Sequence, residues 1–438
     1  MVQKQLVKNP SLFIQSCVFL IPLTAYLTRA YGIINKINAK KGVYILVEKY
    51  KLKRRATQMV RDGYPVLLKE DFVKEPIESE GTVVELLDDN KKFVARAYLA
   101  KQNKGDGWIL TLNENEKIDQ SFFEHLFKQA AAERVSLKEN EQTTAYRFFN
   151  GEGDGLGGLT IDMYADYYVF SWYSIGIYKH QQTILKAFLS AVPNVKGVYE
   201  KIRYQSKTKP ETDHIYGEEA PEPLLIKENG ITYATYLNDG LMTGIFLDQR
   251  NVRNSILENY SMDKTVLNTF SYTGAFSVAA AIGGASHTTS VDLANRSLEK
   301  TKEQFEVNNL DPELQTIRVM DVFDYFRYAI RKQLSFDTVI VDPPSFARSK
   351  KRTFSVAKDY TALLEDIIDI TNEDGVIIAS TNAANISTER FEQFIENAFD
   401  NKGMSYQILE KHTLSEDFKI NPHYPQSDYL KVYVIRKG

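Results

Sequence analysis

Residues 265–276 read TVLNTFSYTGAF, and residues 336–344 read FDTVIVDPP. Each stretch begins as a short run of apolar and β-branched residues and ends in a polar loop, which is typical of a buried strand in a parallel sheet. Five further strand-like runs follow along the chain, and segments with helical spacing separate most of them. This alternation predicts an α/β fold with a doubly wound, Rossmann-like domain over residues 241–438.

The predicted elements of this domain alternate regularly until its end. The seven strands are expected at residues 265–270, 287–293, 316–321, 336–344, 375–381, 405–411 and 429–437. The helices are expected at residues 275–282, 295–308, 322–332, 358–371 and 388–399. The last two strands lie close together in the sequence, so an antiparallel pair is expected there.

The ends of four strands carry groups that suit a nucleoside. Gly274, Asp292, Asp321 and Asp342 follow successive strands in this order. Because ligands bind at the carboxyl ends of such strands, these four positions are expected to meet at one edge of the sheet. A glycine admits close backbone approach, one carboxylate accepts the ribose hydroxyls, and another polar group meets the edge of the base.

The loop at 269–276 excludes other cofactors. It has one glycine where a dinucleotide site has three, which disfavours NAD and FAD, and the chain has no P-loop lysine motif. No His-x-x-x-His pair or cysteine cluster exists, so no metal site is predicted. A nucleoside cofactor without phosphates remains. S-adenosylmethionine fits the uncharged polar loop of Ser271, Tyr272 and Thr273.

The composition limits the class of protein. A chain of 438 residues exceeds the size at which one core usually stops growing, so two or three domains are expected. Hydrophobic residues at 43% and charged residues at 25% exclude a disordered or coiled-coil chain. The net charge of −3 removes the simplest sign of nucleic-acid binding, a strongly basic chain. The single cysteine, Cys17, excludes intramolecular disulfides and indicates a reducing, cytoplasmic location.

Residues 1–40 are predicted to be an N-terminal extension of uncertain character. Residues 11–28 carry no charge and reach the lower limit for a membrane span. They also have the character of a signal-peptide apolar region, although Pro22 interrupts the run and no small-x-small cleavage site stands out. The need for a cytoplasmic cofactor argues against both readings. A poorly structured extension or a start site placed too far upstream is favoured, and no stable membrane association is expected.

One segment is strongly basic. Nine Lys or Arg and one acid, Glu48, lie between Lys36 and Arg61. Strand-like stretches follow at residues 81–89, 92–100 and 107–113, which predicts a small β-barrel with a basic strip over residues 41–118. The strip is either a solvated face or a phosphate-binding surface. In the second case the RNA-binding candidates are Lys49, Lys51, Lys53, Arg54, Arg55 and Arg61.

Residues 119–240 are predicted to form a linking helix and an α+β middle domain. Asp119 is placed to cap a helix whose apolar residues recur at helical intervals to about residue 139. A glycine-rich stretch around Asp154 then leads into an apolar, strand-like run, a helix over residues 178–191 and a strand over residues 195–201.

Four of these stretches resemble one family. They are TVLNTFSYTGAFSVAAA (265–281), SVDLANRSLE (290–299), VDPPSFARSK (341–350) and GIFLDQRNVR (244–253). They are similar to the large-subunit ribosomal RNA methyltransferases of the RlmI and RlmK types, and the resemblance covers residues 42–438. It implies an enzyme that uses S-adenosylmethionine to methylate a base of ribosomal RNA, expected to be 23S. It also implies a PUA-like RNA-binding barrel; a homodimer is one option for the assembly.

The resemblance implies roles for individual residues. The loop around the methionine part is formed by Phe270, Ser271, Tyr272, Thr273, Gly274, Ala275 and Phe276. Asp292 with Leu293 is expected at the ribose, Asp321 at the adenine amino group, and Asp342-Pro343-Pro344 at the methyl-transfer site. Asp248, Gln249 and Arg250 are expected to form a lid over cofactor or substrate, and Arg253 follows in the same segment. For Arg250 and Arg253 a surface ion pair is the alternative role.

One departure from the RlmI type changes the expected chemistry. RlmI-type enzymes methylate C5 of cytosine, which needs a cysteine thiolate to add to C6 first. The corresponding strand, residues 375–387, has Ser380, Thr381 and Asn382 and no cysteine. The sequence STN is similar to the RlmK type, which methylates a ring nitrogen of guanine. A nitrogen lone pair attacks the methyl group directly, so positioning suffices.

Asp342, the carbonyl of Pro343, Asn382 and a stacking Phe346 are therefore the catalytic candidates. Phe346 sits one residue later than the aromatic of the amino-methylating motif, which disfavours exocyclic-amine chemistry. His423 is a weaker candidate, as a proton acceptor. Two other functions stay open: a methyltransferase acting on a protein or small molecule, and a non-catalytic RNA-binding assembly factor.

Overall fold

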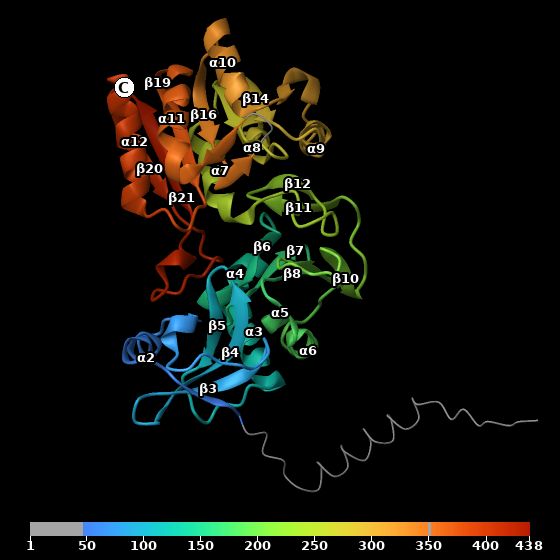
Figure 1. Ribbon diagram of the computed structural model, residues 1–438. Helices are drawn as coiled ribbons and strands as arrows, with labels where there is room; N and C mark the ends of the chain where they lie inside the picture. The colour runs from blue at the N-terminus through green and yellow to red at the C-terminus, as the bar shows by residue number, and fades with distance from the viewer. Residues whose placement is uncertain (1–46, 349–351) are drawn as a thin grey trace, which may run out of the picture. The chain divides into compact units, whose positions relative to one another are not determined.

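The computed structural model describes residues 47–348 and 352–438. Its C-terminal part contains a seven-stranded sheet in the order β15-β14-β13-β16-β19-β21-β20 (Figure 1). The first five strands in this order run parallel, and β21 is antiparallel to both neighbours. The predicted doubly wound domain, with its antiparallel final pair, is confirmed. The strands are β13 (Thr265–Thr269), β14 (His287–Asp292), β15 (Thr316–Val319), β16 (Phe336–Val341), β19 (Thr371–Thr381), β20 (Tyr406–His412) and β21 (Lys431–Lys437).

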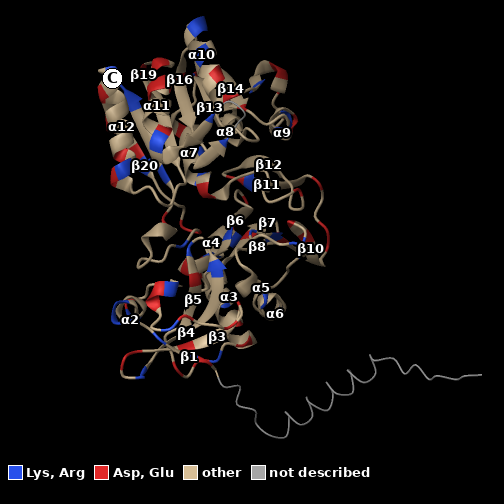
Figure 2. Ribbon diagram, viewed as in Figure 1, with Lys and Arg blue, Asp and Glu red and all other residues tan. Residues whose placement is uncertain are grey.

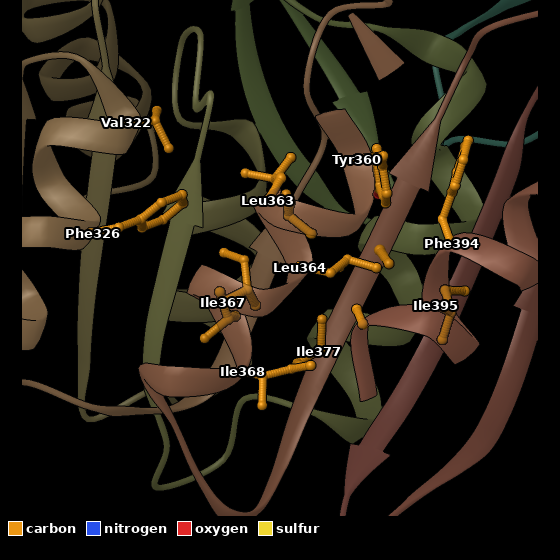
Figure 3. Close-up of a cluster of buried hydrophobic side chains, with 14 of the residues drawn as sticks. Val322, Phe326, Tyr360, Leu363, Leu364, Ile367, Ile368, Ile377, Phe394 and Ile395 are labelled. Carbon is orange, nitrogen blue, oxygen red and sulfur yellow. The ribbon is translucent and has the colours of Figure 1, made fainter. Parts of the chain in front are cut away.

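Helices cover both faces of this sheet because its strands are apolar on both sides. Ile377 and Ala379 of β19 point into a core with α10, α11 and α12, whereas Val376 and Ile378 point into a core with α7 and α8. Figure 3 shows the first core, where Leu363 and Ile367 of α11 lie near Ile377. The helices are α7 (Arg250–Asn259), α8 (Ala275–Ile282), α9 (Arg296–Glu306), α10 (Val322–Lys332), α11 (Val356–Asp369) and α12 (Thr388–Lys402).

A second, five-stranded sheet in the order β1-β3-β4-β5-β2 lies near the N-terminal end of the described chain. Its strands are β1 (Lys49–Lys51), β2 (Val66–Leu67), β3 (Val83–Leu87), β4 (Phe93–Gln102) and β5 (Gly105–Thr111), so the three strands predicted between residues 81 and 113 are present. The sequence did not predict helix α2 (Arg54–Arg61), which follows β1. Its buried residues, Ala56, Thr57 and Val60, span barely two turns, too few for a clear helical period.

The middle part of the chain is an α+β arrangement, as predicted. Asp119 accepts hydrogen bonds from the backbone N–H groups of Ser121 and Phe122 and so caps α3 (Gln120–Glu133), which α4 (Val135–Lys138) follows. The five-stranded sheet has the order β10-β9-β8-β7-β6. Its elements are β6 (Ala145–Asn150), β7 (Leu159–Tyr164), β8 (Tyr167–Trp172), α5 (Ile175–Tyr178), α6 (Gln181–Ala191), β9 (Gly197–Ile202) and β10 (Thr212–Gly217). A hairpin of β11 (Leu224–Glu228) and β12 (Ile231–Thr235) leads to the C-terminal sheet.

The glycine-rich stretch packs against the N-terminal sheet at very short range. A Cβ on Gly157 would lie 1.9 Å from Cδ1 of Trp108, so only glycine fits there. The hydroxyl of Tyr98 donates to the carbonyl of Gly157 at 2.6 Å, and Nε1 of Trp108 donates to Glu152 at 3.0 Å. Residues Glu48–Gly438 form one compact unit. The domain boundaries at residues 40, 118 and 240 stay predictions.

Several predictions concern residues outside the described chain. They include the extension at residues 1–40, the apolar run at residues 11–28 and Cys17. Within residues 47–348 and 352–438, the longest apolar helices fall short of what is needed to cross a membrane.

Candidate active site

A cavity of about 630 Å³ opens at the carboxyl ends of β13, β14 and β16. Most of the predicted site residues line it: Gln249, Phe270, Ser271, Tyr272, Thr273, Ala275, Phe276, Asp292, Leu293, Asp321, Asp342, Pro343, Phe346 and Asn382. Arg250 and Gly274 belong to the same predicted set, but they do not line the cavity. The fold thus brings together residues that lie up to 133 positions apart in the chain.

The loop after β13 turns its backbone toward the cavity. Phe270, Tyr272 and Gly274 all have left-handed backbone conformations, with φ of 55°, 53° and 79°. Such conformations cost energy for non-glycine residues and cluster at functional sites. Gly274 begins α8, and a Cβ there would lie 2.5 Å from Cγ2 of Thr301 on α9. This glycine therefore allows α8 and α9 to pack closely, while the residues around it face the cavity.

Two carboxylates at strand ends shape the cavity wall. Asp292 accepts hydrogen bonds from the backbone N–H of Tyr272 at 2.9 Å and of Ala294 at 2.8 Å. One oxygen of Asp321 accepts from the N–H groups of Phe323 and Asp324, and it caps α10. Asp292 is thereby held by its own loop and by the loop after β13, Asp321 is held by the first turn of α10, and each still lines the cavity.

Asp342 lies half-buried at the end of β16. Nε2 of Gln249 is 3.3 Å from its Oδ2 and donates at 2.9 Å to the hydroxyl of Ser380. Burial raises the pKa of Asp342 to about 6, the negative charge of Asp248 adds to this effect, and hydrogen bonds from Ser380 and Gln249 oppose it. This carboxylate is therefore poised to change charge just below neutral pH.

The polar rim beyond Asp342 comes from two neighbouring loops. Asn382 follows β19, and its Oδ1 accepts a hydrogen bond from the hydroxyl of Ser345 at 2.8 Å. Phe346 begins a short hairpin of β17 (Phe346–Arg348) and β18 (Thr353–Ser355) and is 63% exposed. An aromatic ring so exposed at the rim of a cavity is available for stacking on a flat ligand.

The residues present fit S-adenosylmethionine. The cavity volume lies in the range of small-molecule sites, and the lining is apolar and aromatic with a few fixed carboxylates. Phe270, Phe323 and Phe354 pack edge-on or tilted on one another, with ring centres 5.7 to 6.4 Å apart. The only glycine of the 269–276 loop is engaged in helix packing, so this loop offers no pyrophosphate cradle.

The predicted lid is only partly at the cavity. Asp248 and Gln249, in the short 3₁₀ helix η3 (Leu247–Gln249), line it. Arg250 instead forms a bidentate pair with Asp417, at 2.6 and 3.2 Å. Arg253 lines the cavity and is also paired, with Glu228 at 2.6 and 2.8 Å. Both arginines are therefore ion-paired, but the pairs are buried and do not lie at the surface as the alternative expected.

His423 is not at the cavity. It is exposed, and its ring lies beside Gly63, where a Cβ would be 2.8 Å from Cδ2 of the histidine. A role for His423 as a proton acceptor in the cavity is wrong for this arrangement, because the segment that carries it turns toward the N-terminal sheet. The sequence shows only that a loop carries this histidine.

A second cavity, of about 330 Å³, was not predicted from the sequence. It shares six lining residues with the first: Met242, Ile245, Phe246, Asp248, Tyr272 and Asn382. Its other wall is one face of the middle sheet, where Arg147, Lys201 and Arg203 line it. The alternation of Lys201 and Arg203 along KIR (201–203) could have indicated a polar strand face. The sequence does not reveal that this face adjoins the cofactor cavity.

The predicted basic strip is mostly exposed and partly neutralised. Lys49 pairs with Glu85 at 2.8 Å, and Arg61 with Asp88 at 2.8 Å. Arg54 and Arg55 are exposed on α2, and Figure 2 shows the concentration of basic residues there. Lys51 is the last residue of β1, and Lys53 directly precedes α2. RNA binding by this strip stays a prediction.

The residues described here hold no group of three or more His, Cys, Asp or Glu side chains arranged to bind a metal ion.

Comparison with known proteins supports the cofactor. Residues 182–422 match the model of an S-adenosylmethionine-dependent methyltransferase family, and residues 51–112 match that of a PUA-like domain. The crystal structure of SMU.776, described as a methyltransferase complexed with SAH, superposes with a TM-score of 0.84 at 45% identity. That match covers 89% of this chain and 100% of the other.

Two curated relatives point the same way. YwbD of Bacillus subtilis (strain 168), which is named among the ribosomal RNA large subunit methyltransferases, is 50% identical over 390 residues. This covers 88% of this chain and 98% of YwbD. Ribosomal RNA large subunit methyltransferase I of Aliivibrio fischeri (strain MJ11) is 32% identical over 360 residues, 81% of this chain and 90% of the relative. The chain belongs to the S-adenosylmethionine-dependent ribosomal RNA large subunit methyltransferase family, with a PUA-like domain near its N-terminus.

Proposed function

We propose that this enzyme transfers the methyl group of S-adenosylmethionine to a ring nitrogen of a guanine in 23S ribosomal RNA. The observation that carries the choice of atom is the end of β19, where Ser380, Thr381 and Asn382 stand beside Asp342 and no thiol is present. The one cysteine of the chain is Cys17, which precedes every residue of the cavity by more than 200 positions.

The absence of a thiol matters because of what cytosine C5 requires. This carbon becomes nucleophilic only after a thiolate adds to C6, and a serine or threonine hydroxyl is far too basic to replace the thiolate at neutral pH. A guanine ring nitrogen already has a lone pair. An enzyme that methylates it has only to hold the base in line and stabilise the positive charge that develops.

The cavity residues are suited to these two tasks. When bound, S-adenosylmethionine supplies an electrophilic methyl group. The loop of residues 270–276 would hold its methionine part, Asp292 its ribose and Asp321 its adenine amino group. Phe346 would stack on the target base, and Asn382 with the carbonyl of Pro343 would orient it. Asp342, ionised above pH 6, would stabilise the positive charge on the methylated base.

Further parts of the proposal concern the setting of the reaction. The basic strip from Lys49 to Arg61 would add affinity through phosphate contacts, and the reaction would need no metal ion. The enzyme would act in the cytoplasm, where its RNA substrate is made. The target base would be extruded from its stack, because a stacked base cannot align with the methyl group.

The decisive test is nucleoside mass mapping of ribosomal RNA from cells with and without the gene. We expect one methylguanosine to disappear from 23S RNA and to return on complementation. Loss of a 5-methylcytosine instead would refute the choice of atom. Calorimetry with S-adenosylmethionine addresses the assembly-factor alternative, which predicts no binding. Methylation of a protein or metabolite without any change in RNA would favour the remaining alternative.

A further inference from the structure

Charged and polar residues of the middle sheet form one wall of the second cavity. Pairing along β7, β8 and β9 places Asp162 beside Arg147 and Val169, and Ser171 beside Lys201, on one face of the middle sheet. The opposite face of this sheet is an aromatic core that contains Phe148, Phe170 and Trp172. A sheet face buried beneath other elements is normally apolar as well. The other end of the same face follows this rule, because Ala145, Tyr164, Val169 and Tyr199 pack there in a hydrophobic cluster with β11, β12 and α8. Only the end that carries Lys201 and Arg203 is polar, and this end lines the second cavity.

The cations on this face differ in how they are paired. Arg147 is neutralised by Asp162, with Nε 2.6 Å from Oδ1. Lys201 is only 1% exposed, and its Nζ donates to the backbone carbonyls of Leu237 and Gly240. Nη2 of Arg203 donates to the carbonyl of Leu241 at 2.7 Å. Among residues 47–348 and 352–438, neither Lys201 nor Arg203 forms an ion pair with a carboxylate.

Arg203 also has an unused donor. Its Nε is buried and has no hydrogen-bond partner within the described chain. A buried N–H without a partner loses the hydrogen bond that it would make to water, so such groups are rare unless a ligand satisfies them. Burial lowers the pKa of Lys201 to about 8, the positive charge of Arg203 adds to this effect, and the negative charges of Asp239 and Asp162 oppose it. An anion in this cavity would satisfy both groups.

The second cavity adjoins the cofactor cavity, and this position indicates which kind of anion would bind there. Phe246, Asp248 and Asn382 line both cavities, so a ligand in the second reaches the cavity of Asp342. Phe246 is 41% exposed and its ring centre is 5.3 Å from that of Tyr272, which leaves an aromatic surface between the two cavities. A nucleotide whose base enters the first cavity would place its backbone phosphate in the second.

We propose that the second cavity is the phosphate site for the target nucleotide, in which Lys201 and Arg203 bind an RNA backbone phosphate next to the base that is methylated. This inference rests on the proposed function, because it assumes an RNA substrate. In this proposal, residues of the middle sheet, which contains β6 to β10, hold the target nucleotide in position. The exposed basic strip near the N-terminus then contributes general attraction to RNA.

The test compares full-length Arg203→Gln and Lys201→Gln with the wild type and with Arg331→Gln. Arg331 is an exposed arginine in the last turn of α10, about 12 Å along the helix from the cavity residue Phe323. The substrate is ribosomal RNA from cells that lack the gene, and the methyl donor is radiolabelled S-adenosylmethionine. Arg203→Lys keeps the charge and tests for rescue, and thermal melting confirms that each variant folds.

We expect Arg203→Gln to raise the KM for RNA about tenfold and to change the affinity for S-adenosylmethionine by no more than about twofold. The slope of the logarithm of the RNA-binding constant against the logarithm of the salt concentration should become shallower by about 0.7 to 0.9, which corresponds to one lost phosphate contact. Arg203→Lys should recover part of the loss, and Arg331→Gln should behave as wild type. An unchanged KM and salt slope in a folded Arg203→Gln would overturn the inference. So would a loss confined to S-adenosylmethionine binding, because the anion would then be the carboxylate of the cofactor. A wild-type enzyme that methylates no RNA would instead refute the proposed function.

Discussion

Two carboxylates in neighbouring parts of this enzyme, the half-buried Asp342 and the buried Asp417, are held in opposite ways. Asp342, in the cofactor cavity, has hydrogen bonds only from the neutral side chains of Gln249 and Ser380, and no Lys or Arg among the described residues forms an ion pair with it. Asp417, in the loop before η5 (Pro425–Ser427), accepts hydrogen bonds from the Arg250 guanidinium, the backbone N–H of Arg147 and the hydroxyl of Ser415. Its own carbonyl accepts two more from Arg134. One aspartate is thus weakly hydrogen-bonded in the cofactor cavity, whereas the other joins three distant segments of the chain.

The difference follows from what each environment does to a charge. A carboxylate at the wall of an apolar cavity loses solvation without compensation, so its charged form is destabilised. A carboxylate surrounded by a guanidinium and by N–H and O–H donors keeps its charge, and removing it leaves those donors unpaired. Replacing each carboxylate by its amide should therefore change stability in opposite directions.

The largest effect is expected from Asp417→Asn. This change leaves the buried guanidinium of Arg250 without its counter-ion and should lower the free energy of unfolding by about 3–5 kcal/mol. Denaturant unfolding at pH 7.5 measures it. The matched control is Glu416→Gln, an exposed neighbour, which should change stability by less than about 0.5 kcal/mol. Equal effects of the two changes would show that Asp417 does not hold this region together.

The next effect is on catalysis at Asp342. Asp342→Asn removes the negative charge proposed to face the methylated base, and the rate of methyl transfer should fall about 100-fold. In the wild type, kcat should fall as the pH drops through about 6, because protonation neutralises the same carboxylate. Asp248 and Arg253 also act on this group, so RNA binding is measured at each pH as a control. A wild-type rate that stays constant down to pH 5 would contradict this role.

A smaller effect of opposite sign is expected on stability. The pKa of Asp342 is about 6 in the folded enzyme and near 3.8 when unfolded, so the charged carboxylate weakens folding above pH 6. Asp342→Asn should raise the free energy of unfolding by about 1–2 kcal/mol at pH 8, a value that allows for partial solvation. The gain should shrink as the pH falls toward 4. Denaturant unfolding at pH 8 and pH 5 measures the change in the free energy of unfolding. A loss of stability in Asp342→Asn at pH 8 would show that this carboxylate stabilises the fold, as Asp417 does.

The smallest effect is expected at the exposed strip. Arg54→Gln together with Arg55→Gln should weaken RNA binding about two- to fivefold at low salt and much less at high salt, because exposed charges are screened. The control is the pair Arg331→Gln and Lys332→Gln at the end of α10. Fluorescence anisotropy with ribosomal RNA at two salt concentrations measures the change. A loss as large as that expected for Arg203→Gln would place the principal RNA contacts in the strip.

The two carboxylates also show how far sequence reasoning reaches. Asp342 stands directly after a run of apolar β-branched residues, so its position at a strand end, and hence at the cavity, could be predicted. Asp417 stands in a polar loop with no period, and its three arginine neighbours lie between 167 and 283 positions earlier in the chain. Nothing local distinguishes it from the exposed Glu416 beside it. The same holds for Arg250: the sequence places it in the motif GIFLDQRNVR, but it does not show that Asp417 is the partner of this arginine.

By itself, the sequence determined the order of the seven strands of the C-terminal sheet and of five helices between them, the strand-end residues of the cofactor cavity, and the absence of a cysteine from the reacting strand. These follow from local periodicity and from the rule that parallel strands end at one edge. Only the tertiary structure decided which charges are neutralised. It paired Arg250 and Arg253 with distant carboxylates, and it gave Lys201 and Arg203 no carboxylate partner among the residues that the structure describes. The physical reason is that burial and pairing depend on contacts between segments far apart in the chain, and a residue's neighbours in sequence carry no record of those contacts.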